Sequence, residues 1–261
     1  MKIALHGATG RMGRAIVRLV KEGGADQIVG AVAHSSAPEQ GQDIGELASV
    51  GPLGVLVSAD LGAALLGADA LIDFSTATAI VPLVKAAVRA KVALVIGTTG
   101  VDAAGQAAIE QAAREIPVLW AANMSLGVEL LAEMARMAVR ALGADYDVEI
   151  VETHHRHKID APSGTALRLA EAVREARSEL VTRSSREGNV GPRPNSELGV
   201  FALRGGDVIG DHTIHLMGEG DRIEITHRAT QRDIFARGAL RGARWLVGKP
   251  AGRYAIRDII R

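Results

Sequence analysis

The sequence predicts an α/β fold: a parallel sheet with crossover helices in the first half, followed by an α+β half with a mixed sheet. Three observations support this prediction. Up to about residue 125, short runs rich in valine, isoleucine and leucine alternate with helical patterns, which is typical of a parallel sheet. These runs are continuously apolar, as in a sheet that is covered on both faces. Beyond residue 125, longer helices and alternating strands take over.

The first half should contain strands separated by helices, and each helix is indicated by apolar residues three or four positions apart. The third strand has the weakest signal. The expected strands span residues 2–6, 27–33, 55–57, 70–74, 92–96 and 117–121. The expected helices span residues 14–21, 77–90 and 102–114.

The second half mixes long helices with strands. Helices are expected at residues 126–142, 165–178 and 234–247, and strands at residues 146–153, 200–204, 213–217 and 222–226. The last two strands should form a hairpin through Gly218-Glu219-Gly220-Asp221. Residues 182–198 lack periodicity and are predicted to be a long loop, which in compact domains is commonly functional or mobile.

The composition narrows the functional classes. Lys plus Arg equals Asp plus Glu at 30 each, and aromatic residues make up 3%, so nothing favours nucleic acid or an acidic membrane surface as partner. No cysteine is present, which excludes disulfides, thiolate metal sites and a cysteine nucleophile. The opening residues have no apolar run long enough for a signal peptide, and no run reaches the length of a membrane helix. We therefore expect a soluble cytoplasmic protein.

A glycine-rich turn separates the first expected strand from the first expected helix. It reads Gly7-Ala8-Thr9-Gly10-Arg11-Met12-Gly13. Glycines at such a turn permit a sharp bend, close approach of a pyrophosphate and close packing of helix on strand. The spacing differs from the commoner G-x-G-x-x-G, and a purely structural turn is the alternative. Its place directly after the first strand favours a dinucleotide site.

Three further segments are expected to contact a dinucleotide because they follow strands of the same sheet. The second strand ends at His34, with no carboxylate until Glu39, which leaves room for a 2′-phosphate and slightly favours NADPH over NADH, or use of both. The other two segments are Gly97-Thr98-Thr99 and Ala121-Ala122-Asn123-Met124. The alternative to cofactor binding is a solvated loop at His34 and simple helix capping at the other two segments.

The segment richest in chemistry lies in the second half, just before a helical pattern. It reads Glu152-Thr153-His154-His155-Arg156-His157-Lys158-Ile159-Asp160-Ala161-Pro162-Ser163-Gly164-Thr165. Histidine exchanges protons near neutrality, and a helix N-terminus with cations beside it can hold a small dianion. Ser163, Gly164 and Thr165 are therefore expected to bind a carboxylate through a hydroxyl and backbone N–H groups. A histidine metal site is less favoured, because the neighbouring cations would repel the ion.

This segment, with the glycine turn, resembles the 4-hydroxy-tetrahydrodipicolinate reductase family, and the resemblance covers nearly the whole chain. The other blocks that resemble the family are Asp73-Phe74-Ser75, Gly97-Thr98-Thr99-Gly100, Ala122-Asn123-Met124-Ser125, Gly210-Asp211-His212-Thr213 and Glu224–Arg228. The end of the second strand departs from the family, since it carries Ala33-His34 where relatives often carry Glu-Arg.

The resemblance implies a Rossmann-type dinucleotide-binding domain, residues 1–125 completed by 232–261, and a substrate-binding and oligomerisation domain, residues 126–231. It also implies reduction of a cyclic dicarboxylate by NADPH or NADH in lysine and diaminopimelate biosynthesis, by a homotetramer formed through the second sheet. The implied catalytic groups are His154 and Lys158. The implied substrate contacts are His155, Gly164 and Thr165.

Two rival functions share part of these features. Another nicotinamide enzyme, such as an amino-acid or sugar dehydrogenase, would carry the glycine turn but would not need the histidine segment. A redox-sensing regulator would bind NADPH without turnover. The hypothesis of a reductase depends on the histidine segment, because it supplies acid–base chemistry next to an anion site.

Overall fold

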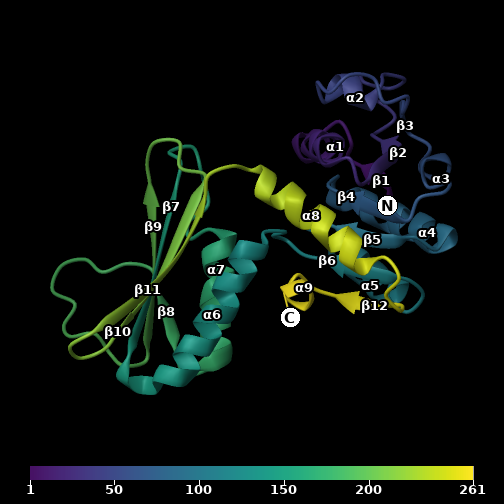
Figure 1. The fold of residues 1–261 in the computed structure, drawn as a ribbon. Coiled ribbons are helices and arrows are strands. Elements are labelled where there is room, and N and C mark those ends of the chain that lie inside the picture. The colour runs from purple at the N-terminus through teal and green to yellow at the C-terminus, as the bar shows by residue number, and fades with distance from the viewer. Residues whose placement is uncertain (261) are drawn as a thin grey trace. The chain divides into compact units, whose positions relative to one another are not determined.

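The computed structural model describes residues 1–260 and divides into two compact units (Figure 1). The first comprises Met1–Ser125 together with the segment that begins at Asp233, and the second comprises Leu126–Arg232. Each unit has its own sheet. No helix among the described residues combines the length and the apolarity needed to cross a bilayer.

The sheet of the first unit is parallel throughout, which confirms the predicted fold class. Its strand order is β12-β6-β5-β4-β1-β2-β3. Strands β2 and β3 are added on one side of β1, and β4, β5 and β6 on the other, so the strand order switches between β1 and β4. The strands are β1 (Lys2–His6), β2 (Gln27–Val32), β3 (Val57–Ser58), β4 (Ala70–Asp73), β5 (Ala93–Ile96), β6 (Pro117–Trp120) and β12 (Gly252–Tyr254).

Helices cover both faces of this sheet, and as a result every residue of β4 and β5 is buried. Helices α3, α4 and α5 share one apolar core with the sheet, while α8 packs against β4, β5, β6 and α1. The helices of this unit are α1 (Arg11–Gly23), α2 (Ile44–Leu47), α3 (Leu61–Ala64), α4 (Ile80–Ala90), α5 (Ala103–Ala112), α8 (Asp233–Leu246) and α9 (Arg257–Ile260). A 3-10 turn, η1 (Ala77–Ala79), precedes α4.

The sheet of the second unit is mixed, also as predicted, with the order β11-β10-β7-β9-β8. Strand β9 runs parallel to β7 and β8, whereas β10 runs antiparallel to β7 and β11. The strands are β7 (Asp147–His154), β8 (Val181–Arg183), β9 (Glu197–Arg204), β10 (Gly210–Met217) and β11 (Arg222–Ala229). The expected hairpin turn is present, since the Gly218 amide donates to the Asp221 carbonyl oxygen at 3.0 Å.

Two helices, α6 (Leu126–Leu142) and α7 (Gly164–Ala176), cover one face of the second sheet (Figure 1). Their apolar side chains form a core with the inward-facing residues of β7, β9 and β10. A short 3-10 turn, η2 (Gly143–Asp145), connects α6 to β7. The other face of the sheet carries no helix of this unit.

The prediction of a loop over residues 182–198 is wrong at both ends. Strand β8 occupies its beginning, and β9 starts at Glu197. The pattern failed here because Glu197 is buried through ion pairs with Arg183 and Arg186 rather than through apolarity. Four further elements were not predicted, because they are only three or four residues long and show no measurable period: α2, α3, α9 and β12.

Candidate active site

The glycine turn lies at the carboxyl end of β1 and leads directly into α1. Gly7 has a φ of +74°, and a Cβ at this position would lie 2.3 Å from the Phe74 carbonyl oxygen. A Cβ on Gly13 would lie 2.2 Å from the Ala8 carbonyl oxygen. Both positions therefore require glycine, because the backbone approaches itself too closely for any side chain.

The N-terminus of α1 is built to receive an anion. Its N-cap, Gly10, provides no side-chain acceptor, and the first turn contains no acidic residue. The exposed side chain of Arg11 adds positive charge at the same end. A thirteen-residue helix presents unpaired amides and the positive end of its dipole here. These residues fit the pyrophosphate of a dinucleotide.

The other residues predicted to contact a cofactor follow β2, β5 and β6, so they lie at the same sheet edge as the glycine turn. His34 is exposed, and its Nδ1 lies 2.7 Å from the Ser36 hydroxyl oxygen. Thr99 and Ala122 are exposed. Met124 is buried in the first unit, where a Cβ on Gly238 would meet its carbonyl oxygen.

A buried carboxylate ties three strand ends together beneath this edge. Asp73 is fully buried and accepts from the Thr98 hydroxyl at 2.7 Å, while His6 Nδ1 lies 2.8 Å from its other oxygen. The Ser75 amide donates to the Thr98 hydroxyl oxygen at 3.0 Å. The Thr98 side chain is thus engaged within the protein. An acidic residue at the end of an apolar strand was the sequence signal for this network.

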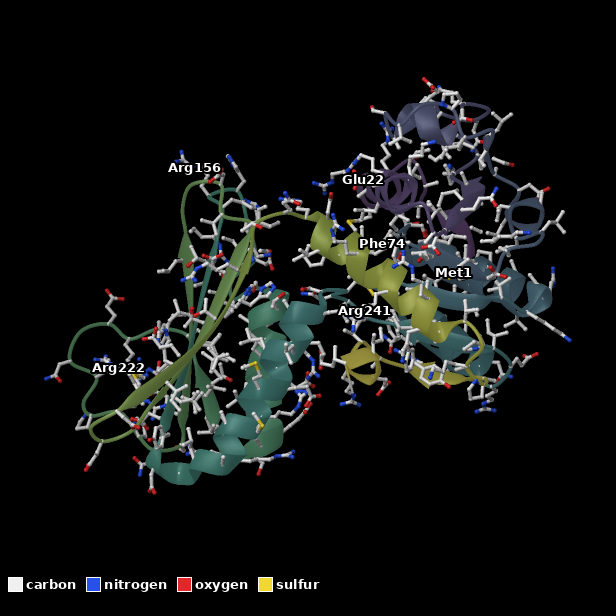
Figure 2. The ribbon with its side chains drawn as sticks, in the orientation of Figure 1. Met1, Glu22, Phe74, Arg156, Arg222 and Arg241 are labelled. Carbon is white, nitrogen blue, oxygen red and sulfur yellow. The ribbon has the colours of Figure 1, made fainter. Side chains whose placement is uncertain are left out.

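The histidine segment, Glu152–Thr165, starts in the last three residues of β7 and continues into the loop beyond it (Figure 2, near Arg156). His154 is the last strand residue and is buried, with 11% of its side chain exposed. His155 has left the ladder, and its amide donates to the Val208 carbonyl oxygen at 2.7 Å. His157 is exposed. The two adjacent histidines are therefore not held on opposite faces of one continuous strand.

Glu152 holds the His154 imidazole, a role that the sequence did not indicate. Its carboxylate is fully buried and lies 2.5 Å from His154 Nδ1. Arg204 donates to both oxygens, at 2.8 and 2.9 Å, and the Ser163 amide donates at 2.9 Å. Burial alone would raise the pKa of Glu152, but the hydrogen bonds from Arg204, His154 and Ser163 outweigh it and lower the pKa. Glu152 is therefore ionised at neutral pH.

Ser163 connects this carboxylate to the start of α7. Its hydroxyl accepts from the Ala166 amide at 3.1 Å, as an N-cap does, and lies 3.2 Å from Nε2 of His212. Since its amide also donates to Glu152, both polar groups of Ser163 are engaged within the protein. The neighbouring Gly164 is exposed, and a Cβ there would meet no heavy atom within 4 Å.

Lys158 lies on the same segment but has its own partner. Its ammonium donates to both carboxylate oxygens of Asp160, at 2.7 and 2.9 Å, and this bond lowers the pKa of Asp160. Burial, followed by the charge of Arg232, lowers the pKa of His155, which places a further cation near the segment. No group of three or more His, Asp or Glu side chains within residues 1–260 is arranged to hold a metal ion.

Family comparison supplies the identity of this architecture. The model described as "Dihydrodipicolinate reductase, N-terminus" matches residues 1–124, and the one described as "Dihydrodipicolinate reductase, C-terminus" matches residues 127–260. The chain belongs to the dihydrodipicolinate reductase family. As a member of this family it is an NAD(P)H-dependent oxidoreductase, and its N-terminal Rossmann-like domain indicates a nicotinamide dinucleotide as cofactor.

Curated relatives of the dihydrodipicolinate reductase family match from end to end. A 4-hydroxy-tetrahydrodipicolinate reductase of Anaeromyxobacter dehalogenans is 50% identical, with 99% of this chain and 97% of the relative covered. One from Syntrophotalea carbinolica is 44% identical, covering 100% and 98%. A dipicolinate-bound dihydrodipicolinate reductase from Paenisporosarcina sp. TG-14 shares the fold, with a TM-score of 0.79, 22% identity and coverage of 98% and 97%.

A second buried histidine of this family member makes its stability depend on pH. The His212 ring lies edge-on to His154, with centroids 5.2 Å apart. Burial, reinforced by the charges of His154, His227 and Lys158, lowers the pKa of His212 from 6.5 to about 4. The unfolded chain then binds a proton more readily than the folded chain between these values. The stability contributed by neutral His212 is therefore complete above about pH 6.5 and falls as the pH drops toward 4.

We expect this loss to reach roughly 3 kcal/mol of unfolding free energy, since one pKa unit corresponds to about 1.4 kcal/mol. Urea denaturation followed by circular dichroism at pH 7 and pH 4.5 measures it. Most of the loss should disappear in His212→Gln and persist in His157→Gln, which alters an exposed histidine. Equal losses in both variants would contradict the assignment to His212.

Proposed function

We propose that this protein reduces 4-hydroxy-tetrahydrodipicolinate to tetrahydrodipicolinate, with loss of water, in lysine and diaminopimelate biosynthesis. The observation that carries the proposal is the His154 imidazole, held by buried Glu152 next to the N-terminus of α7. The names of the curated relatives support the substrate, and the bound dipicolinate named for the Paenisporosarcina enzyme supports a cyclic dicarboxylate.

The N-terminus of α7 is proposed to bind one substrate carboxylate. Open space beside Gly164 leaves room for it, and the first-turn amides of a thirteen-residue helix favour an anion. Ser163 uses its hydroxyl and amide internally, and the exposed Gly164 and the adjacent Thr165, both in the first turn of α7, are proposed as direct contacts. His155 and Lys158 lie on the preceding loop and complete the proposed set.

The proposed chemistry needs one proton donor. Bound nicotinamide supplies a hydride, and the substrate carbon that becomes electron-rich after its addition must then be protonated. His154 is proposed to donate that proton from Nε2, because Nδ1 is occupied by Glu152. Lys158 is proposed to offset the charge of a substrate carboxylate and to assist proton transfer. The reaction consumes one reduced dinucleotide and one proton and releases one water.

The direct test follows NADPH absorbance while the preceding aldol enzyme generates the substrate in place. Oxidation that depends on that enzyme, with tetrahydrodipicolinate identified by mass spectrometry, supports the proposal. Binding of NADPH with no oxidation would favour the regulator instead. Oxidation only with an amino-acid or sugar substrate would favour another dehydrogenase.

A slight preference for NADPH over NADH, or use of both, is proposed for the cofactor site. Glu39, the first carboxylate after β2, pairs with Arg14 at 3.1 Å, so it is not free to repel a 2′-phosphate. The exposed residues Arg11 and His34 remain beside the strand end. We expect His34→Asp to raise the NADPH dissociation constant about 10-fold, equivalent to about 1.4 kcal/mol, because the new carboxylate repels the phosphate and suits the ribose hydroxyl of NADH. Titration of both dinucleotides checks this; an unchanged ratio of constants would contradict it.

A homotetramer is proposed to form through the uncovered face of the second sheet. Val181 and Leu203 lie on this face and are 67% and 54% exposed. Large exposed apolar side chains on a sheet face commonly mark an interface. Sedimentation velocity should give four copies for the unaltered chain and smaller species for Leu203→Glu. A monomer at micromolar concentration in the unaltered chain would refute the proposal.

A further inference from the structure

We propose that Glu152 is the positioning residue of the active site: it fixes the tautomer and the orientation of His154. This inference rests on the proposed function, in which His154 is the proton donor. It extends that function to a residue outside the set predicted from the sequence. The carboxylate acts through the imidazole and not on the substrate, because it is fully buried and surrounded by donors from the protein.

The hydrogen-bond pattern determines which ring nitrogen carries the proton. One oxygen of Glu152 accepts from Arg204 and lies 2.5 Å from His154 Nδ1; the other accepts from Arg204 and from the Ser163 amide. An ionised carboxylate only accepts hydrogen bonds. Nδ1 must therefore be the donor, and the neutral ring keeps its lone pair on Nε2. Any proton that His154 exchanges with a substrate passes through Nε2.

The environment of Nε2 supports this assignment. Within residues 1–260, Nε2 of His154 forms no hydrogen bond to the protein, although the ring is mostly buried. A Cβ on Gly210 would lie 2.9 Å from Nε2. Glycine at the start of β10 therefore leaves this nitrogen unobstructed. Nδ1 is therefore held by Glu152, and Nε2 is left available for proton exchange.

The Glu152 carboxylate is fixed in place because Arg204 balances its charge. Arg204, on β9, neutralises Glu152 and also donates to the Asp160 carbonyl oxygen. The Ser163 amide, at the N-cap of α7, donates to the same carboxylate, so Glu152 is held from both sides. The other titratable groups that interact with the His154 imidazole are His212 on β10, whose ring lies edge-on to it, and His155 on the following loop. Neither is hydrogen-bonded to the His154 ring. Only Glu152 determines its tautomer.

The test replaces Glu152 with glutamine, whose amide both donates and accepts, so that the tautomer is no longer imposed. We expect kcat to fall on the order of 10²-fold, at the lower end of the 10²- to 10⁴-fold that a positioned general acid contributes, while the substrate KM changes less than about 3-fold. The ¹⁵N NMR signals of the neutral His154 ring, assigned by their loss in His154→Ala, should show Nδ1–H alone in the unaltered protein and both tautomers in Glu152→Gln. A single Nδ1–H tautomer in both proteins would overturn the proposal.

A double-mutant cycle separates positioning from general support of the fold. If Glu152 acts through His154, Glu152→Gln should cost nothing further in a His154→Ala background. An equal loss of kcat in both backgrounds would also overturn the proposal. Because Glu152→Gln leaves Arg204 without its counter-charge, Glu152→Gln/Arg204→Gln provides a folded alternative should the single variant be unstable. Absence of turnover in the unaltered protein would refute the proposed function alone, since the NMR measurement needs no substrate.

Discussion

Replacing His154 with alanine is expected to lower kcat about 10³-fold, because a positioned general acid contributes roughly 10²- to 10⁴-fold. This corresponds to about 4 kcal/mol of transition-state free energy. The NADPH dissociation constant should stay within about 2-fold, equivalent to about 0.4 kcal/mol, since the glycine turn belongs to the other compact unit. Steady-state kinetics and fluorescence titration measure the two quantities.

The matched control is His157→Ala, which removes an exposed imidazole from the same segment. Its kcat should remain near that of the unaltered protein. The pH dependence of kcat/KM adds a second readout, because an ionisation between about pH 5 and 8 that belongs to a histidine acid must vanish with that histidine. Full turnover by His154→Ala would remove the proposed proton donor and, with it, the chemistry proposed for this site.

Replacing Lys158 with alanine is expected to lower kcat/KM about 10²- to 10³-fold, with losses in both substrate affinity and turnover. Truncating one partner of a desolvated charge pair costs about 2–5 kcal/mol, and Lys158 is proposed to pair with a substrate carboxylate. In this structure its ammonium pairs with Asp160, which is 56% exposed. An exposed pair of this kind is worth about 0–1 kcal/mol, so a substrate carboxylate can replace Asp160 at little cost.

Arg156→Ala is the matched control, since it removes an exposed cation from the same loop (Figure 2). A much smaller effect there would show that position, and not net charge, matters. Lys158→Ala should leave NADPH binding near normal. A large loss of NADPH affinity instead would show that the lysine has been assigned to the wrong ligand.

Periodicity predicted most of the fold because the relevant forces are local in sequence. Continuous apolar runs such as those of β4 and β5 can only be buried on both faces, which requires a parallel sheet with helices on each side. The bounds of α6 are those expected. The predicted element bounds were wrong where burial depends on paired charges, as at Glu197, and the shortest elements were not predicted because they show no period.

The candidate site could be predicted only in part. The residue types of His154 and Lys158, next to a helix N-terminus, indicated acid–base chemistry and an anion site, and their roles stay predictions. The partners of these groups could not be read in advance: Glu152 and Arg204 are 52 residues apart, and Ser163 and His212 are 49 apart. Both pairs form across elements that the fold brings together.

By itself, the sequence determined where strands and helices alternate, where glycine turns interrupt them, and which segment concentrates proton-exchanging and cationic side chains. These are properties of neighbouring residues, so spacing and residue type suffice to find them. Only the tertiary structure decided that Glu152 is buried and ionised, that His154 points Nδ1 at it, and that His212 is kept neutral. The reason is physical: burial and pairing set the charge of a group, and both depend on residues distant in the chain.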